Sequence, residues 1–211
     1  MTAAERNTSE THGDVIFDFD FNELTLRRRW LKNVPYLSLE HTPQLKAVVA
    51  KLIEVNAGDF TWSNTFRPAF VARLMQHGFL TMATSVGRDM FALLPKLHRN
   101  RCIISTSDLK VQRGTAKRAK KFRLSTNSAF DDVIAGLREQ HGKGCWFYDP
   151  LIASLREIME NPGKFDVVEE GKTLEGVKQP KQLVAVRVHT FEIWDAESGK
   201  LAAGEIGCSV G

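Results

Sequence analysis

The sequence predicts an α+β fold, and three observations support this prediction. Helix-like and strand-like stretches alternate irregularly, without the regular strand–helix repeat of a doubly wound parallel sheet. Toward the end of the chain, LVAVRVHTFEIWD and KLAAGEIG flank the turn AESG, which indicates a β-hairpin. No internal repeat is visible. At 211 residues, 43% of them hydrophobic and 26% charged, the chain has an ordinary globular composition and enough length for a sizeable core.

The first half of the chain contains two predicted amphipathic helices. Residues 43–57 place Leu45, Val48, Val49, Leu52 and Ile53 on one face, with Thr42 as the N-terminal cap and Pro43 in the first turn. Residues 66–77 form the second helix, which we expect to end at Gly78. Around these helices the sequence predicts a disordered tail over 1–13 and strands over 15–21, 79–83, 89–95 and 102–106.

Two further helices are predicted in the second half. The first covers 128–140, with Ser128 as cap and Asp131 three residues later, the spacing of a capping box. The second begins at Asp149-Pro150 and carries Leu151, Leu155, Ile158 and Met159 on one side. Residues 161–182, rich in Gly, Pro and charge, are predicted to be a loop or insertion before the final hairpin.

Composition limits the classes of function. The three cysteines are widely spaced and form no CxxC pair, so we expect reduced thiols, no metal site and no cofactor. The first twenty residues lack the apolar core of a secretory signal, and no apolar stretch is long enough to cross a bilayer. We therefore expect a cytoplasmic monomer without a membrane partner. No GxSxG, P-loop or GxGxxG motif is present.

The strongest local charge anomaly is the basic segment, residues 110–123. Its seven cations face no acidic residue within the segment: Lys110, Arg113, Lys117, Arg118, Lys120, Lys121 and Arg123. One interpretation is a solvated helix face. The other is a surface for phosphates, since each neutralised phosphate releases a condensed counterion. The segment lacks interleaved aromatics, which favours backbone contact with structured RNA over a single-strand stacking platform.

Trp146 lies in GKGCWFYDP, close to the start of a predicted helix. A tryptophan in such a place often packs as a lid on the core. Its neighbours favour a binding site, because Gly142 and Gly144 allow close approach of the backbone and Phe147 and Tyr148 extend an aromatic surface. Farther on, we expect His189 to be a packed, hydrogen-bonded histidine and Glu192 to be salt-bridged or exposed.

Three stretches together resemble the leucyl/phenylalanyl-tRNA–protein transferases: FRLSTNSAFDDVIAG, GCWFYDPLIASL and VHTFEIWDAESGKLAAGEIGCSVG. The family has "AF..VI..C", then "GTWI", then "HS.EVW...LVGG.YGV..G". Upstream, PAFVARLMQHGF is similar to the helix before the family's "GIFPW". The resemblance covers roughly 66–211. The residues at positions that match the last motif are His189, Glu192, Trp194, Leu201, Gly204, Gly207 and Gly211.

The resemblance implies an N-terminal α/β domain over 14–100 and, over 101–211, part of a GNAT-like (N-acyltransferase) domain interrupted by the insertion. It implies transfer of a leucyl or phenylalanyl group from aminoacyl-tRNA, the co-substrate, to acceptor proteins with an N-terminal Arg or Lys, marking them for degradation. Trp146 and Phe147 would bind the aminoacyl side chain. Arg113, Lys117, Arg118, Lys120, Lys121 and Arg123 would bind tRNA.

The chain departs from the family at several positions. Thr81-Met82 replaces the Pro-Trp after "GIF", and Leu155 stands where the family has an aromatic residue. The family's "GESMFS" and "DCQ" segments would follow Gly211, so we expect the catalytic residues beyond it and expect the chain to be truncated. Two alternatives stay open: a GNAT-type acyltransferase that uses acyl-CoA, and a non-catalytic RNA-binding relative.

Overall fold

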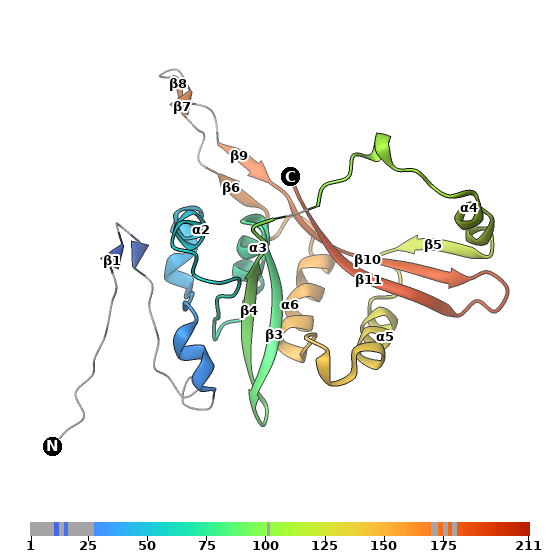
Figure 1. Ribbon diagram of the computed structural model, residues 1–211, viewed down its shortest axis with the longest axis horizontal. Helices are drawn as coiled ribbons and strands as arrows, with labels where there is room; N and C mark the ends of the chain where they lie inside the picture. Colours follow the sequence, from blue (N-terminus) through green and yellow to red (C-terminus); the bar gives the residue numbers. More distant parts are fainter. Residues whose placement is uncertain are drawn as a thin grey trace.

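The computed structural model describes residues 11–12, 15–16, 28–100, 102–169, 173–174, 177–178 and 181–211, and has the predicted α+β architecture (Figure 1). Its helices are α2 (Leu45–Glu54), α3 (Pro68–Gln76), α4 (Arg113–Ala119), α5 (Phe130–His141) and α6 (Asp149–Glu160). Short 3-10 helices are η1 (Arg29–Asn33), η2 (Leu39–Gln44), η3 (Thr106–Asp108) and η4 (Gly142–Gly144). The strands are β1 (Thr11–His12), β2 (Val15–Ile16), β3 (Phe79–Gly87), β4 (Met90–Leu97), β5 (Phe122–Thr126), β6 (Val167–Glu169), β7 (Thr173–Leu174), β8 (Val177–Lys178), β9 (Gln182–Val184), β10 (Val186–Asp195) and β11 (Leu201–Val210).

The predicted terminal hairpin is the longest feature of the structure. Strands β10 and β11 pair antiparallel from Val186↔Val210 to the turn at 196–199, where Gly199 has a positive φ of 68°. β5 pairs with the second half of β10, from Phe191↔Thr126 onward, which gives the sheet order β11-β10-β5. Alternate residues of β10 are buried because one face of the sheet carries helices.

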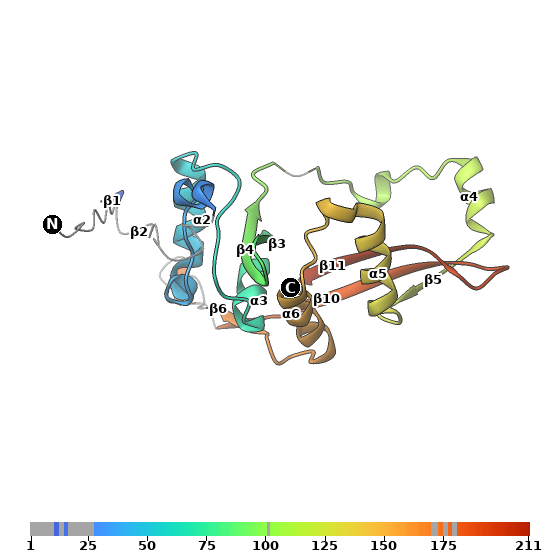
Figure 2. The same ribbon diagram turned by 90° about the horizontal axis from the view of Figure 1, so that it is seen from below.

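Helices α3, α5 and α6 cover this face of the β10–β11 hairpin (Figures 1 and 2). A second hairpin, β3–β4, stands beside α3 and α6. One cluster of buried side chains joins these parts, and it contains residues from both sides of position 100, such as Phe70, Phe79, Phe130 and Val188. The division into domains 14–100 and 101–211 therefore stays a prediction, since the buried core is continuous across it.

Several predicted elements agree with the structure. α3 begins at Pro68, as a proline in the first turn allows, and Gly78 has the positive φ (85°) expected after its end. The predicted strands 79–83 and 89–95 are the cores of β3 and β4. α6 starts at Asp149-Pro150, and Leu151, Leu155 and Ile158 are buried. Of the face predicted for α2, Leu45, Val48 and Leu52 are buried, but Ile53 is 50% exposed.

The structure differs from the sequence-based predictions at a strand and a helix cap, and it adds detail to the stretch 161–182. Residues 102–105 form no strand, because nothing pairs with them in the described chain. Thr42 is not a cap: the helical turn starts earlier, at η2, where the Ser38 hydroxyl accepts a hydrogen bond from the Glu40 backbone N–H. Within 161–182, predicted to be a loop or insertion, the described residues include short paired strands, since β6 pairs with β9 and β7 with β8. The predicted tail (1–13) and strand (15–21) lie outside the described residues, except β1 and β2, which pair.

Candidate functional site

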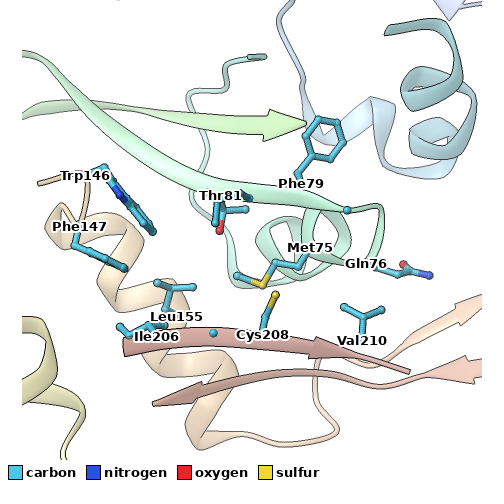
Figure 3. A pocket seen from close by; sticks show the side chains of 13 residues that line it. Met75, Gln76, Phe79, Thr81, Trp146, Phe147, Leu155, Ile206, Cys208 and Val210 are labelled. Carbon is cyan, nitrogen blue, oxygen red and sulfur yellow. The ribbon is translucent and has the colours of Figure 1, made fainter. Parts of the chain in front are cut away.

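A cavity of about 350 Å³ opens between α3, β3, β11 and the start of α6 (Figure 3). This volume lies in the range of small-molecule sites. The lining is mostly apolar and comes from segments far apart in the sequence. Its residues are Met75, Gln76, Gly78, Phe79, Leu80, Thr81, Trp146, Phe147, Leu155, Ile206, Gly207, Cys208 and Val210. The cavity can thus accept a bulky apolar group from solvent.

The aromatic wall of the cavity consists of Trp146 and Phe147. Their rings stack with centroids 3.9 Å apart. Arg138 from α5 fixes this loop, since its Nε donates a hydrogen bond to the Phe147 carbonyl oxygen (3.1 Å) and its guanidinium pairs with Asp149. Tyr148 points elsewhere and packs on Phe91 of β4, with ring centroids 5.1 Å apart. Both predicted substrate-binding residues therefore line one cavity.

The structure gives the two glycines before Trp146 a different setting from the predicted one. Gly142 follows α5 with a positive φ of 50°, so it turns the chain out of the helix. At Gly144, a Cβ atom would meet nothing within 4 Å. Neither glycine is among the residues that line the cavity. Gly142 therefore lets the chain turn out of α5, whereas neither the backbone nor the surroundings of Gly144 require a glycine.

α6 supplies Leu155 to the cavity and is fixed against α3. The Ser154 hydroxyl donates a hydrogen bond to the Phe66 carbonyl oxygen just before α3, and it also contacts the Pro150 carbonyl oxygen at 3.0 Å. Leu155 is buried. It is one of the positions where the chain departs from the transferase family, and so is Thr81. Both positions line the same cavity as Trp146.

Thr81 brings a polar atom to this apolar lining. The residue lies on β3 and is only 3% exposed, and its side chain points into the cavity between Trp146 and Met75 (Figure 3). Among the residues that the structure describes, none donates to or accepts a hydrogen bond from its hydroxyl group. Among the described residues, the fully buried side-chain nitrogen and oxygen atoms without a hydrogen-bond partner are Trp62 Nε1 and Arg99 Nε, so the Thr81 hydroxyl is reached from the cavity.

Strand β11 forms the opposite side of the cavity. Ile206, Cys208 and Val210 alternate along the strand and face the same way, as Figure 3 shows. Their partners across the hairpin, Thr190, Val188 and Val186, belong to the buried face of β10. The cavity thus lies on the helix-covered side of the sheet, at the end of the hairpin away from its turn.

The other end of the hairpin holds a buried carboxylate, Glu192. It is 0% exposed and accepts hydrogen bonds from three hydroxyl groups: those of Ser125 (2.6 Å), Thr190 (2.5 Å) and Ser128 (2.9 Å). The backbone N–H groups of Ser128 and Ala129 also donate to it, at 3.2 and 3.3 Å. These two groups lead into α5, so Glu192 acts as the N-terminal cap that we had assigned to Ser128 and Asp131.

The hydrogen bonds determine the protonation of Glu192. Burial alone would raise its pKa, but the hydroxyl groups of Ser125, Thr190 and Ser128 outweigh that effect and lower the pKa from its ordinary value of 4.5 to about 2. The expectation of a salt-bridged or exposed Glu192 was wrong. The neighbouring His189 is partly buried, and its Nε2 lies 3.0 Å from the Ser209 hydroxyl, as expected of a hydrogen-bonded histidine.

The six predicted tRNA-binding cations lie together but away from the cavity. Arg113, Lys117 and Arg118 are on α4, Lys120 and Lys121 follow it, and Arg123 is on β5. All are exposed, and α4 buries no residue. None takes part in an ion pair with a described residue, although Arg123 lies over the Trp194 ring at 5.9 Å. α4 lies next to β5, beside the turn-end half of the hairpin and far from α3 (Figures 1 and 2).

In comparisons with known proteins, no protein-family model matches the chain and no curated protein matches it. Within the described ranges, no group of three or more His, Cys, Asp and Glu side chains is placed to hold a metal ion. No helix in this part of the chain is both long and apolar enough to span a membrane.

Sequence reasoning found the aromatic wall but missed the two buried polar groups. Thr81 looked like an ordinary strand residue, because nothing in its neighbours reveals a cavity. For Glu192, the hydroxyl-rich run STNS at 125–128 was visible in the sequence, but only the pairing of β5 with β10 brings it to the carboxylate.

Proposed function

We propose that this protein is an aminoacyl-tRNA–protein transferase homologue with a GNAT-like domain over 101–211, which moves a bulky apolar aminoacyl group, leucyl or phenylalanyl in the family, from tRNA to the N-terminal Arg or Lys of an acceptor protein. One observation carries the proposal. Trp146 and Leu155 stand at positions that the family resemblance relates to an aminoacyl pocket, and both line the same cavity. Met82, at the position of the family's pocket tryptophan, is not part of this lining, but the preceding residue, Thr81, is.

The chemistry suits a site of this kind. The α-amino group of the acceptor attacks the ester carbonyl of the aminoacyl-tRNA, an amide bond forms, the ester C–O bond breaks, and the tRNA leaves with a free terminal hydroxyl group. The attacking amine must lose a proton. This reaction needs chiefly positioning of the two reactants. The cavity would hold the side chain of the transferred group, between the stacked rings of Trp146 and Phe147 and the apolar side chains of Leu155 and Ile206.

The basic segment supports a nucleic-acid partner. Its cations lack ion-pair partners in the described chain, and α4 has no buried face, so these side chains are not needed for packing. By strand rise, β5 and the cavity floor lie ~20 Å apart along the hairpin. A tRNA could span this distance, with its phosphates on α4 and its aminoacyl end in the cavity.

Glu192 does not serve as the proton acceptor in this proposal. A carboxylate with a pKa of about 2, which is fully buried and already accepts five hydrogen bonds, is a weak base at neutral pH. Its place at the matching position of the family motif is explained by its cap on α5. No residue of this chain is assigned as the general base.

The test is transfer by the purified 211-residue protein from Leu-tRNA and Phe-tRNA to a peptide with an N-terminal arginine. Trp146→Ala removes the larger ring of the aromatic wall. We expect it to lower kcat/KM about tenfold to a hundredfold, the scale of losing one large apolar contact. Trp30→Ala, which removes an exposed indole outside the cavity, is the matched control. Since the resemblance implies catalytic residues beyond Gly211, absence of transfer together with absence of Leu-tRNA and Phe-tRNA binding contradicts the function. Full activity, or full aminoacyl-tRNA affinity, of Trp146→Ala contradicts the pocket.

A further inference from the structure

If the cavity binds a purely apolar ligand side chain, the hydroxyl group of Thr81 has no role in binding it. Its residue is more than nine-tenths buried, it points into the cavity, and it has no hydrogen-bond partner among the described residues. The neighbouring buried threonine, Thr61, shows the usual arrangement, since its hydroxyl donates to the Pro95 carbonyl oxygen at 3.2 Å. Thr81 is paired with the same Pro95 across the β3–β4 hairpin, but its side chain points into the cavity.

We infer that Thr81 is a specificity-determining residue, and that the cavity selects an aromatic side chain that carries a hydroxyl group over one that does not. The stacked rings of Trp146 and Phe147 favour an aromatic ring beside them. The Thr81 hydroxyl then forms the hydrogen bond that the protein itself does not supply. A ligand without a polar group leaves this hydroxyl without a hydrogen bond. The lost hydrogen bond weakens the binding of that ligand relative to a ligand that supplies one.

The remaining lining supports an aromatic ligand with one polar atom. Beside Thr81, the lining includes the apolar side chains of Met75, Leu155 and Ile206 and the aromatic pair, which match a ring. The other polar side chain in the lining, Gln76, already accepts a hydrogen bond from Arg73. Met and Cys side chains adapt to ring edges, and both kinds line this cavity, as Met75 and Cys208. No charged residue is part of the lining, so the polar atom of the ligand is expected to be neutral. A phenol group satisfies these conditions.

The inference rests on the proposed function in taking the natural ligand to be the side chain of an aminoacyl group, and it narrows that function: a hydroxylated aromatic group such as tyrosyl is preferred, and the leucyl and phenylalanyl groups of the family bind more weakly. Its test therefore uses small probes and does not measure transfer. p-Cresol and toluene differ by one hydroxyl group and represent a hydroxylated and a bare aromatic side chain. Binding of each is followed by the NMR signal of the Met75 methyl group, which lines the cavity and is assigned with Met75→Leu.

We expect the wild type to bind p-cresol about fivefold more tightly than toluene, the effect of one net hydrogen bond. Thr81→Val, which has the same shape without the hydroxyl, should abolish or reverse this preference, and Thr81→Ser should retain it. Equal affinities in the wild type, or a preference for p-cresol that persists in Thr81→Val, would overturn the inference.

Thermal unfolding provides a second readout. Thr81→Val replaces an unpaired hydroxyl and should leave the protein as stable as the wild type or more stable, whereas Thr61→Val breaks a buried hydrogen bond and should destabilise it. A Thr81→Val variant as unstable as Thr61→Val would mean that Thr81 is bonded in the protein, against the inference. The two proposals fail separately: p-cresol selectivity without binding of, or transfer from, any aminoacyl-tRNA removes the function alone, and aminoacyl-tRNA binding or transfer without selectivity removes the inference alone.

Discussion

The two ends of the β10–β11 hairpin handle buried polar groups in opposite ways. Near the turn, Glu192 is fully buried and accepts five hydrogen bonds from Ser125, Ser128, Ala129 and Thr190. At the other end, residues 206–210 face an open cavity in which Thr81 has no described partner. One end of this hairpin therefore holds a polar cluster whose hydrogen bonds are all made within the protein. The other end lines a cavity in which the Thr81 hydroxyl of β3 has no described hydrogen-bond partner.

This difference separates structural from binding roles. A buried polar group whose hydrogen bonds are all made within the protein stabilises the fold and specifies its geometry. A buried polar group that lacks a partner at a cavity gains one when a ligand arrives. From the sequence we expected Glu192 to be salt-bridged or exposed, and Thr81 was noted only as a departure from the family. The hydrogen bonds instead make Glu192 the centre of a closed polar cluster and leave the Thr81 hydroxyl without a described partner.

The largest effect in the comparison is expected for Glu192→Ala. It removes the acceptor for five donors and leaves the start of α5 without a cap. We expect a loss of about 3 kcal/mol or more in the free energy of unfolding, measured by urea denaturation. A loss below about 1 kcal/mol would show that the cluster tolerates its missing centre, and the contrast between the two ends would fail.

Acid titration of Glu192→Gln is the matched control. Because the pKa of Glu192 is about 2 in the folded protein and near 4.5 otherwise, its stabilisation is complete above pH 4.5 and is lost as the pH falls toward 2. The pKa of Asp166 is lowered by Arg187, and that of Asp195 by the Ser198 backbone N–H, so both add in the same direction. The difference between the wild type and Glu192→Gln in how the free energy of unfolding falls with acid therefore gives the contribution of Glu192 alone.

A smaller effect on the free energy of unfolding is expected from substitutions of two glycines on β11, Gly204 and Gly207. A Cβ atom at Gly204 would lie 2.7 Å from Val133 Cγ2, since α5 lies directly against β11 there. At Gly207, which lines the cavity, the nearest atom would be Phe191 Cε2 at an ordinary 3.5 Å. We expect Gly204→Ala to cost about 1–3 kcal/mol and Gly207→Ala to be near neutral, by thermal unfolding. Equal costs would contradict tight packing at one end only.

The smallest effect on stability is expected in the basic segment, which lies beside the turn-end half of the hairpin. Changing Lys117, Arg118, Lys120 and Lys121 to Gln should alter the free energy of unfolding by less than about 0.5 kcal/mol, because α4 buries none of its residues. The same variant should bind tRNA more weakly and with a lower salt slope, in filter binding at several salt concentrations. A salt slope equal to that of the wild type would contradict the RNA role.

The sequence predicted the long, strongly patterned elements well. α3, α5, α6 and the final hairpin could be located because their apolar residues follow a helical or strand period and because Pro68, Gly78 and Pro150 mark ends. Caps and short strands were less accurate. Ser128 has the right residue type for a cap, but its hydroxyl donates to Glu192 instead, a partner 64 residues away that local rules do not include.

The candidate site was predictable only in part. GCWFYDP indicated an aromatic site through its own composition, and Trp146 and Phe147 do line the cavity. The basic segment was evident from charge alone, since exposed cations need no tertiary partner. The cavity itself needed α3, β3, α6 and β11 to be placed together, and no local pattern specifies that arrangement.

The sequence by itself determined the α+β class, the places of the main helices and hairpins, the uncompensated charge at 110–123 and the aromatic pair. Periodicity, turn residues and charge act over a few residues, so they can be read along the chain. The tertiary structure decided which polar groups are satisfied: Glu192 meets donors from β5, β10 and the start of α5, while Thr81 faces a cavity. Hydrogen-bond satisfaction depends on neighbours brought together by folding, and only the fold provides them.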